Sequence, residues 1–307
     1  MEALLEIRGL CKSFGHRQII HDLSFDAYAG EVLGFLGPNG SGKTTTIKMV
    51  MGFLFPDKGD IIINHVNVRE NYEEAMKSIG GIVENPEMYK YLSGRTNLEM
   101  YARIHDGIDK SRIDEVIKLV GMENRVNEKI GKFSLGMKQR IGVAQALIHR
   151  PKVLILDEPT NGLDPAGIKE LRDILRKLAH EENVAVVVSS HMLSEMELMC
   201  DRVAIINNGK LLGIKSIDEL REMGGNKTYR FTTKQAREAE RLVNLNYEGR
   251  VAEVTDEYID LAISDEEIGN INALFAFNGI IVTGINKNTE SLEDAYMMIT
   301  GGGNSIA

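Results

Sequence analysis

The sequence predicts an α/β protein with a mainly parallel core sheet, followed by a small α+β domain. Residues 37–44, Gly-Pro-Asn-Gly-Ser-Gly-Lys-Thr, lie between a short apolar strand at 32–36 and an apolar-periodic helical run through 47–51. A second apolar run, 153–156, ends at the acidic pair Asp157-Glu158. Strands and helices alternate beyond that pair, an order that is typical of parallel sheets covered by helices.

Short β-rich segments are expected in the first part of the chain, around the glycine-rich loop. The last of them ends at Glu84-Asn85-Pro86, a combination that signals a loop. Besides the strand at 32–36, these segments are 4–7, 19–25, 61–63 and 79–83.

Residues 87–150 change to helical spacing, so we expect a helical insert that begins and ends at loops. After this insert, 153–156 has the continuous apolar composition of a fully buried parallel strand. Asn207-Asn208-Gly209 predicts a hairpin between two later strands. Helices are expected at 93–104, 111–120, 134–148, 166–179 and 192–199, and strands at 184–189, 202–206 and 210–214.

A domain boundary is expected near 216–226, where a short polar helix ends at Gly224-Gly225. We therefore assign residues 1–217 to the first domain and residues 218–307 to a C-terminal accessory domain. A final helix is expected from Ser291, and the glycine tail at 301–303 is expected to fray. The second domain has βαββαβ order, the split βαβ arrangement, with elements at 227–232, 233–245, 250–254, 258–263, 265–276 and 279–286.

The composition, 43% hydrophobic and 26% charged, is that of an ordinary soluble protein. No apolar run approaches the roughly 20 residues that cross a bilayer, and the first residues lack the features of a signal peptide. The two cysteines, Cys11 and Cys200, imply no disulfide framework and are expected to be buried thiols in a reducing cytosol. The net charge of −9 argues against attraction to a nucleic-acid backbone.

The loop at 37–44 matches the pattern G-x-x-x-x-G-K-[ST] in a strand-loop-helix setting, which disfavours a chance glycine-rich turn. Its backbone N–H groups can turn toward phosphate oxygens, and the helix N-terminus adds partial positive charge. Lys43 is expected to reach the β- and γ-phosphates of ATP as a catalytic group, and Thr44 to hold Mg²⁺. The residues assigned to the nucleotide are Gly37, Asn39, Gly40, Ser41, Gly42, Lys43, Thr44 and Thr45.

Asp157 and Glu158 follow a buried strand, and in open α/β sheets ligands collect at the carboxyl edge. We expect Asp157 to bind Mg²⁺ and Glu158 to polarise the water that attacks the γ-phosphorus. His191 follows the strand at 184–189, so it reaches the same edge and is expected to hydrogen-bond the γ-phosphate. The alternatives are two solvated acids at a strand end and a structural histidine.

Phe14 lies upstream of the phosphate loop in the setting Lys12-Ser13-Phe14-Gly15. A lone aromatic residue near a turn is most simply a core residue. Its setting also suggests a flat ring on which adenine stacks.

With these features in this chain order, the sequence resembles the ATP-binding cassette (ABC) ATPases, the motor subunits of ABC transporters. The resemblance covers residues 1–217 and implies an N-terminal antiparallel β part and a helical subdomain beside the core sheet. It makes Phe14 the adenine-stacking aromatic residue and His191 the switch histidine. It also makes 161–164 the D-loop, which implies that Asp164 lies near nucleotide at a dimer interface.

The family's signature segment, Leu-Ser-Gly-Gly-Gln, is altered here to Phe133-Ser134-Leu135-Gly136-Met137. In the family this segment caps the γ-phosphate bound by the opposite protomer, through the serine hydroxyl, a backbone amide and a helix N-terminus. Ser134 and Gly136 retain these groups, and Ser134 is also an ordinary helix N-cap. The resemblance therefore implies a homodimer with two composite ATP sites.

Glu84 stands where the family usually has a glutamine that contacts Mg²⁺. A carboxylate can still bind the metal or its waters, so we assign Glu84 to the metal site with Thr44 and Asp157. Together with the altered signature and the C-terminal segment 291–303, it makes the whole chain similar to the bacitracin and lantibiotic-resistance branch of the family.

That branch implies an ATPase on the cytoplasmic face of the cell membrane, coupled through a separate permease to removal of a peptide antibiotic. An exporter of another drug or ion is one alternative. A non-transport ABC ATPase acting on ribosomes or DNA is a second, but such proteins usually carry tandem cassettes or a long coiled coil, which this chain lacks. The C-terminal domain is expected to serve assembly or dimer stability, with a small-molecule sensor as the alternative.

Overall fold

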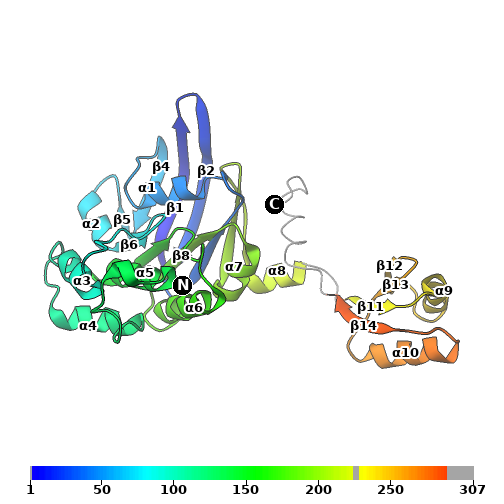
Figure 1. Ribbon diagram of the computed structural model, residues 1–307. Helices are drawn as coiled ribbons and strands as arrows, with labels where there is room; N and C mark the ends of the chain where they lie inside the picture. The colour runs from blue at the N-terminus through cyan, green and yellow to red at the C-terminus, as the bar shows by residue number, and fades with distance from the viewer. Residues whose placement is uncertain (1, 224–227, 289–307) are drawn as a thin grey trace. The chain divides into compact units, whose positions relative to one another are not determined.

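The computed structural model describes residues 2–223 and 228–288 (Figure 1). The chain divides into two compact units between Ile217 and Asp218. The helix predicted from Ser291, the tail at 301–303 and Gly224-Gly225 lie outside the described residues. Each unit is described by itself below.

The core of the first unit is a six-stranded sheet in the order β10-β9-β3-β8-β7-β6. All neighbouring strands run parallel except β10, which forms an antiparallel hairpin with β9. β3, β7 and β8 are buried along their whole length, as their apolar runs predict. The strands are β3 (Val32–Leu36), β6 (Ile79–Ile82), β7 (Val153–Leu156), β8 (Ala185–Ser190), β9 (Arg202–Asn207) and β10 (Lys210–Ser216). The predicted parallel core is confirmed.

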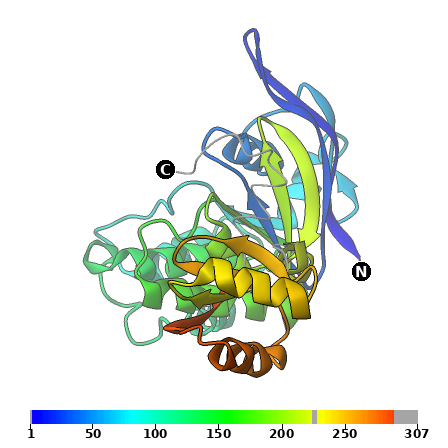
Figure 2. The ribbon, with the colours of Figure 1, turned by 90° about the vertical axis from the view of Figure 1, so that its right-hand side faces the viewer.

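A second, antiparallel sheet has the order β2-β1-β4-β5 and packs its apolar side chains into the same hydrophobic core. Its strands are β1 (Ala3–Phe14), β2 (Arg17–Tyr28), β4 (Lys58–Ile63) and β5 (Val66–Asn67). The expected segments 4–7 and 19–25 were too short, because backbone pairing continues the ladder through a mixture of polar and apolar residues to a tight turn. The resulting β1–β2 hairpin projects from the first unit (Figure 2).

Helices flank the core sheet. α1 (Lys43–Val50) follows β3 directly, while α6 (Pro165–His180) and α7 (Leu193–Met199) follow β7 and β8. The sequence patterns did not predict α2 (Tyr72–Lys77), since it is short and buries only Ala75. Its N-terminus is capped by the Asn71 side chain, which accepts a hydrogen bond from the Glu74 N–H.

The helical insert contains α3 (Gly94–Ala102), α4 (Lys110–Leu119), a 3₁₀ turn η1 (Ile130–Lys132) and α5 (Leu135–Leu147), close to the predicted bounds. Ser93, Asp109 and Ser134 cap the three α-helices through their side-chain oxygens. α5 approaches the edge strand β6 closely at Gly80, where an added Cβ atom would lie 2.0 Å from the Ala146 carbonyl oxygen. This backbone contact holds the insert against the core sheet.

The second unit begins with α8 (Ile217–Met223) at the boundary, and its sheet has the all-antiparallel order β12-β13-β11-β14. Its two later helices pack on this sheet around Phe231 and Phe275, whose ring centroids lie 5.5 Å apart. The predicted βαββαβ order is confirmed, but the last strand starts at Gly284 rather than at 279, because Ile280 is buried in the core before that strand begins. The elements are β11 (Thr228–Thr232), α9 (Ala236–Asn246), β12 (Val251–Val254), β13 (Tyr258–Ala262), α10 (Glu267–Phe277) and β14 (Gly284–Asn288).

Candidate active site

Three neighbouring strands of the core sheet deliver polar groups to one edge. Because β3, β8 and β7 are adjacent and parallel, their carboxyl ends lie together. The phosphate loop at 37–44 follows β3, His191 follows β8, and Asp157-Glu158 follows β7. The sheet therefore brings together residues that are more than 150 positions apart in the chain.

The phosphate loop is tightly packed. An added Cβ atom at Gly37 would lie 2.3 Å from the Ile206 carbonyl oxygen, and Gly42 adopts φ 108° at the N-cap of α1, where glycine is strongly preferred. The buried Ser41 hydroxyl has no hydrogen-bond partner within the described part of the chain. Such an orphaned donor beside a helix N-terminus fits a phosphate oxygen.

Lys43 lies across this loop and is only 4% exposed. Its Nζ donates hydrogen bonds to the carbonyl oxygens of Gly37 and Pro38 at 2.7 and 3.3 Å, and lies 3.5 Å from Glu158 Oε1. Burial lowers the pKa of Lys43, while the nearby Glu158 carboxylate opposes that shift. The positive charge of Lys43 thus lies between the phosphate loop and the acidic pair.

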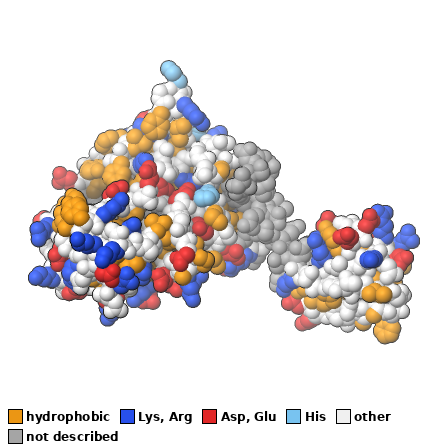
Figure 3. All heavy atoms as spheres, in the orientation of Figure 1, with side chains coloured by type: hydrophobic (Ala, Val, Ile, Leu, Met, Phe, Trp, Pro, Cys, Tyr) orange, Lys and Arg blue, Asp and Glu red, His pale blue; other side chains and the backbone are white. Residues whose placement is uncertain are grey.

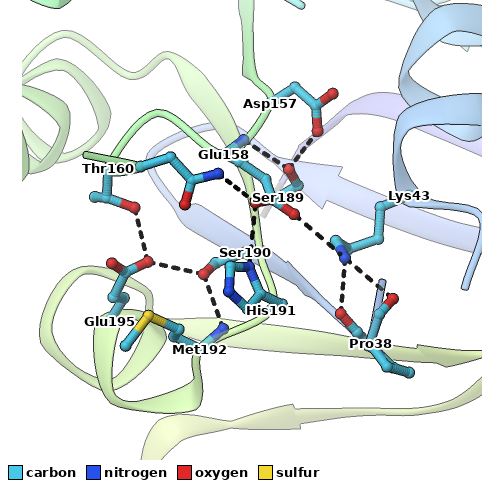
Figure 4. A network of polar contacts seen from close by, with 12 residues as sticks. Pro38, Lys43, Asp157, Glu158, Thr160, Ser189, Ser190, His191, Met192 and Glu195 are labelled. Carbon is cyan, nitrogen blue, oxygen red and sulfur yellow. Dashed lines mark hydrogen bonds and ion pairs between the residues drawn. The ribbon is translucent and has the colours of Figure 1, made fainter. Parts of the chain in front are cut away.

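Glu158 is held from several sides (Figure 4). Its Oε2 accepts a hydrogen bond from Asn161 Nδ2 at 2.6 Å and lies 3.1 Å from His191 Nδ1. Burial opposes ionisation of Glu158, but the Asn161 hydrogen bond and the Lys43 charge outweigh it, so the pKa lies below the usual value. The carboxylate is therefore ionised at neutral pH.

The backbone at Glu158 is strained, with φ +45°, a conformation that costs a non-glycine residue about 1–3 kcal/mol. Its N–H donates to Ser189 Oγ at 2.9 Å, and Ser189 Oγ donates to Asp157 Oδ1 at 2.6 Å. A single buried hydroxyl thus orients both members of the acidic pair. The sequence patterns gave no role to Ser189, and they placed Asn161 in the D-loop but not beside Glu158. The position of Ser189 near the end of a buried strand was the one available signal.

A cavity of about 340 Å³ opens beside the loop and extends to the β1–β2 hairpin. Phe14 is 52% exposed at the end of this hairpin, opposite Arg17, so core packing does not account for its ring. The cavity is lined by Phe14, Arg17, Ile19, Asn39, Gly40, Gly42, Lys43, Thr44, Thr45 and Glu158. An aromatic ring at one end and a phosphate loop at the other match the two ends of a nucleotide.

The remaining predicted site residues do not line this cavity. Glu84 has φ +65° and forms an ion pair with Lys48 at 2.8 Å, which lowers the pKa of the Glu84 carboxyl. Ser134 and Asp164 cap the exposed N-termini of α5 and α6, where they accept hydrogen bonds from the N–H groups of Met137 and Gly167. Gly136 follows Ser134 in the first turn of α5.

The donors at the site suit Mg²⁺. No cluster of three metal-binding side chains occurs within residues 2–223 and 228–288. Mg²⁺ typically uses one or two protein ligands together with phosphate oxygens and water, so the Thr44 hydroxyl and the buried Asp157 carboxylate fit this pattern.

A family model described as "ABC transporter" matches residues 20–161. The "Uncharacterized ABC transporter ATP-binding protein YhcH" of Bacillus subtilis is 48% identical over 98% of this chain and 97% of its own length. The chain belongs to the ATP-binding subunits of ABC transporters. Its membership confirms the predicted family and identifies the protein as an ATPase that binds nucleotide and hydrolyses ATP to power transport.

Two further relatives of this ABC subunit carry substrate names. The "Bacitracin transport ATP-binding protein BcrA" of Bacillus licheniformis is 41% identical over 99% of both chains. The "Lantibiotic transport ATP-binding protein SrtF" of Streptococcus pyogenes is 40% identical over 70% of this chain and 92% of its own. A solved structure titled "Structure of ATP binding subunit of ABC transporter" has a TM-score of 0.64 at 28% identity and covers 71% of this chain and 92% of its own.

Within the described residues of this ABC subunit, no helix is both long enough and apolar enough to cross a membrane.

Two serine hydroxyls of the site provide a matched test of its hydrogen bonding. Ser189→Ala should lower the free energy of unfolding by about 1–3 kcal/mol, because the Glu158 N–H and the Asp157 carboxylate lose their buried partner. Ser41→Ala removes a buried hydroxyl without a partner in the described structure, so it should change stability by less than about 0.5 kcal/mol. Urea unfolding of both nucleotide-free variants measures the difference, and equal losses would contradict the assigned hydrogen bonds.

Proposed function

We propose that this protein powers removal of a peptide antibiotic of the bacitracin or lantibiotic type through a separate permease. The observation that carries the substrate class is the 41% identity to the bacitracin transport protein over 99% of both chains, since that match includes the second unit. The lantibiotic relative matches 70% of this chain at similar identity. Export of another drug or ion is the alternative that the experiments below separate.

For ATP binding, we propose that adenine stacks on Phe14 and that the phosphates lie on the loop at 37–44. Lys43 then donates to the β- and γ-phosphates in place of the two loop carbonyls that it contacts here. Thr44 and Asp157 hold Mg²⁺, which neutralises phosphate charge when bound. A role for Glu84 at the metal requires the Glu84 carboxylate to leave Lys48.

For hydrolysis, we propose Glu158 as the general base that accepts a proton from the attacking water. Its ionised carboxylate, its place in the nucleotide cavity and its contact with Lys43 support this role. His191 Nδ1 lies 3.1 Å from the same carboxylate, and we propose that His191 donates a hydrogen bond to the γ-phosphate.

The site is proposed to be completed by a second copy of the chain. Ser134, Gly136 and Asp164 do not line the cavity, and the N-termini of α5 and α6 are exposed. An exposed helix N-terminus with a serine cap can bind a phosphate of a neighbouring chain. In a two-fold dimer each copy would give its signature segment to the other's ATP.

The permease is proposed to hold the protein on the cytoplasmic face of the membrane. Tyr89 and Tyr91, exposed rings 5.9 Å apart between β6 and α3, offer an aromatic surface for such a partner. A nucleic-acid partner is not proposed, since the net charge is −9 and charges of both signs are interspersed on the face in Figure 3. The second unit is proposed to support assembly.

Replacing the proposed base tests the hydrolytic assignment. Glu158→Gln keeps the size of the side chain but cannot accept a proton, so ATP turnover should fall about a hundredfold or more. ATP affinity should change only a few-fold, because the phosphate loop is intact. Phosphate release and equilibrium nucleotide binding by the purified variant measure the two effects. Glu181→Gln, an exposed carboxylate beyond α6, is the control; full turnover by Glu158→Gln would reject the assignment.

A deletion strain tests the transport assignment. Deleting the coding sequence in the source organism should raise susceptibility to a bacitracin or lantibiotic panel, and wild type but not Glu158→Gln should restore resistance. Purification of the tagged protein from membranes should recover a permease. Unchanged susceptibility to the whole panel, with altered susceptibility to an unrelated drug, would replace the peptide class with the alternative exporter.

A further inference from the structure

Glu195, in the first turn of α7, joins two loops of the active site (Figure 4). Its Oε2 accepts hydrogen bonds from Thr160 Oγ1 at 2.7 Å and from Ser190 Oγ at 2.8 Å. Both hydroxyl-bearing residues are almost fully buried, at 3% and 2% exposure. Ser190 Oγ in turn accepts a hydrogen bond from the Met192 N–H at 3.0 Å, so the network fixes both sides of His191.

The two loops carry the groups proposed for hydrolysis. Thr160 lies two residues after Glu158, and Ser190 immediately precedes His191. The Ser189 hydroxyl already connects the same two loops on the buried side, through Asp157 and the Glu158 N–H. The Glu195 carboxylate is a second connection, and the two together enclose the strained backbone of Glu158.

The helix that carries Glu195, α7, is packed firmly on the core sheet. Its buried side chains Leu193, Met196 and Met199 face the protein interior. An added Cβ atom at Gly34 would lie 2.5 Å from Met196 Sδ, so this helix packs closely on β3. β3 leads directly into the phosphate loop. A carboxylate on α7 is therefore fixed relative to the loop that receives the phosphates.

We propose that Glu195 is a positioning residue for ATP hydrolysis. By accepting hydrogen bonds from Thr160 and Ser190, it holds the loops of Glu158 and His191 in a fixed position relative to the phosphate loop. The proposal rests on the hydrolytic role given above to Glu158. Glu195 does not line the nucleotide cavity, so it acts through the two loops and not on ATP. Its contribution lies in turnover and not in nucleotide affinity.

Two substitutions of Glu195 separate loss of the hydrogen-bond acceptor from loss of the negative charge. Glu195→Ala leaves two buried hydroxyls without their acceptor, whereas the amide oxygen of Glu195→Gln can still accept from both. Glu195→Ala should lower kcat about ten- to a hundredfold, because a small displacement of a catalytic group has effects of this order. The Kd for ATP should stay within about twofold of wild type, and Glu195→Gln should keep most of the turnover.

Thr160→Val removes the hydroxyl that donates to Glu195 and keeps a side chain of similar size. It should lower kcat as well, and the double variant Thr160→Val with Glu195→Ala should be no slower than Glu195→Ala alone, because both remove one interaction. Glu181→Ala, an exposed carboxylate outside the network, is the control for loss of a negative charge.

The experiment measures kcat and ATP binding of each purified full-length variant, with thermal unfolding to normalise for folded protein. A purely structural role predicts a lower melting temperature with unchanged kcat per folded molecule, and that result would overturn the inference. Equal losses in Glu195→Gln and Glu195→Ala would also overturn it, since they would show that hydrogen-bond acceptance is not what matters. If the wild type hydrolyses no ATP, the proposed function fails first and the inference falls with it.

Discussion

The parallel pairing of β3 with β8, and of β8 with β7, is the constraint on which the site depends. It places the phosphate loop, the acidic pair and His191 at one edge, although they come from distant parts of the chain. All three strands are buried along their whole length, so a one-residue shift of register would move each side chain to the opposite face and disrupt its packing. The apolar core therefore fixes the geometry of the polar groups above it.

The buried charged groups at this edge have hydrogen-bond or ion-pair partners within the site. Lys43 and Asp157 are buried, and a buried charge costs several kcal/mol unless it is paired or hydrogen-bonded. Lys43 has two loop carbonyls and Glu158, while Asp157 has the Ser189 hydroxyl. The Ser41 hydroxyl is different, since it is buried without a partner in the described residues. The site is thus rigid around the acidic pair and keeps a donor available on the phosphate side.

The sequence patterns predicted the features that depend on local order. β7 is a continuous apolar run that ends at an acidic pair, and the phosphate loop is fixed by glycine positions, so both were located by residue number. The helical spacing at 93–104 and 111–120 likewise located the starts of α3 and α4 within one or two positions.

Other features depend on tertiary contacts that no local pattern contains. The bridge from Thr160 through Glu195 to Ser190 joins residues about 30 positions apart, and the ion pair of Glu84 with Lys48 joins residues 36 positions apart. The β1–β2 hairpin extends beyond the apolar segments through residues of mixed polarity, which pair across the two strands. The roles of Phe14, Ser134, Gly136 and Asp164 toward nucleotide remain predictions.

Each ATP site is proposed to be completed by a second copy of this chain. The molar mass of Glu158→Gln in solution with saturating ATP, measured by light scattering during size-exclusion chromatography, tests this proposal. Since Glu158→Gln is expected to bind ATP and hydrolyse it very slowly, we expect the mass of two chains with ATP and of one chain without it. A single-chain mass at ATP concentrations that fill the site would show that no second copy completes it.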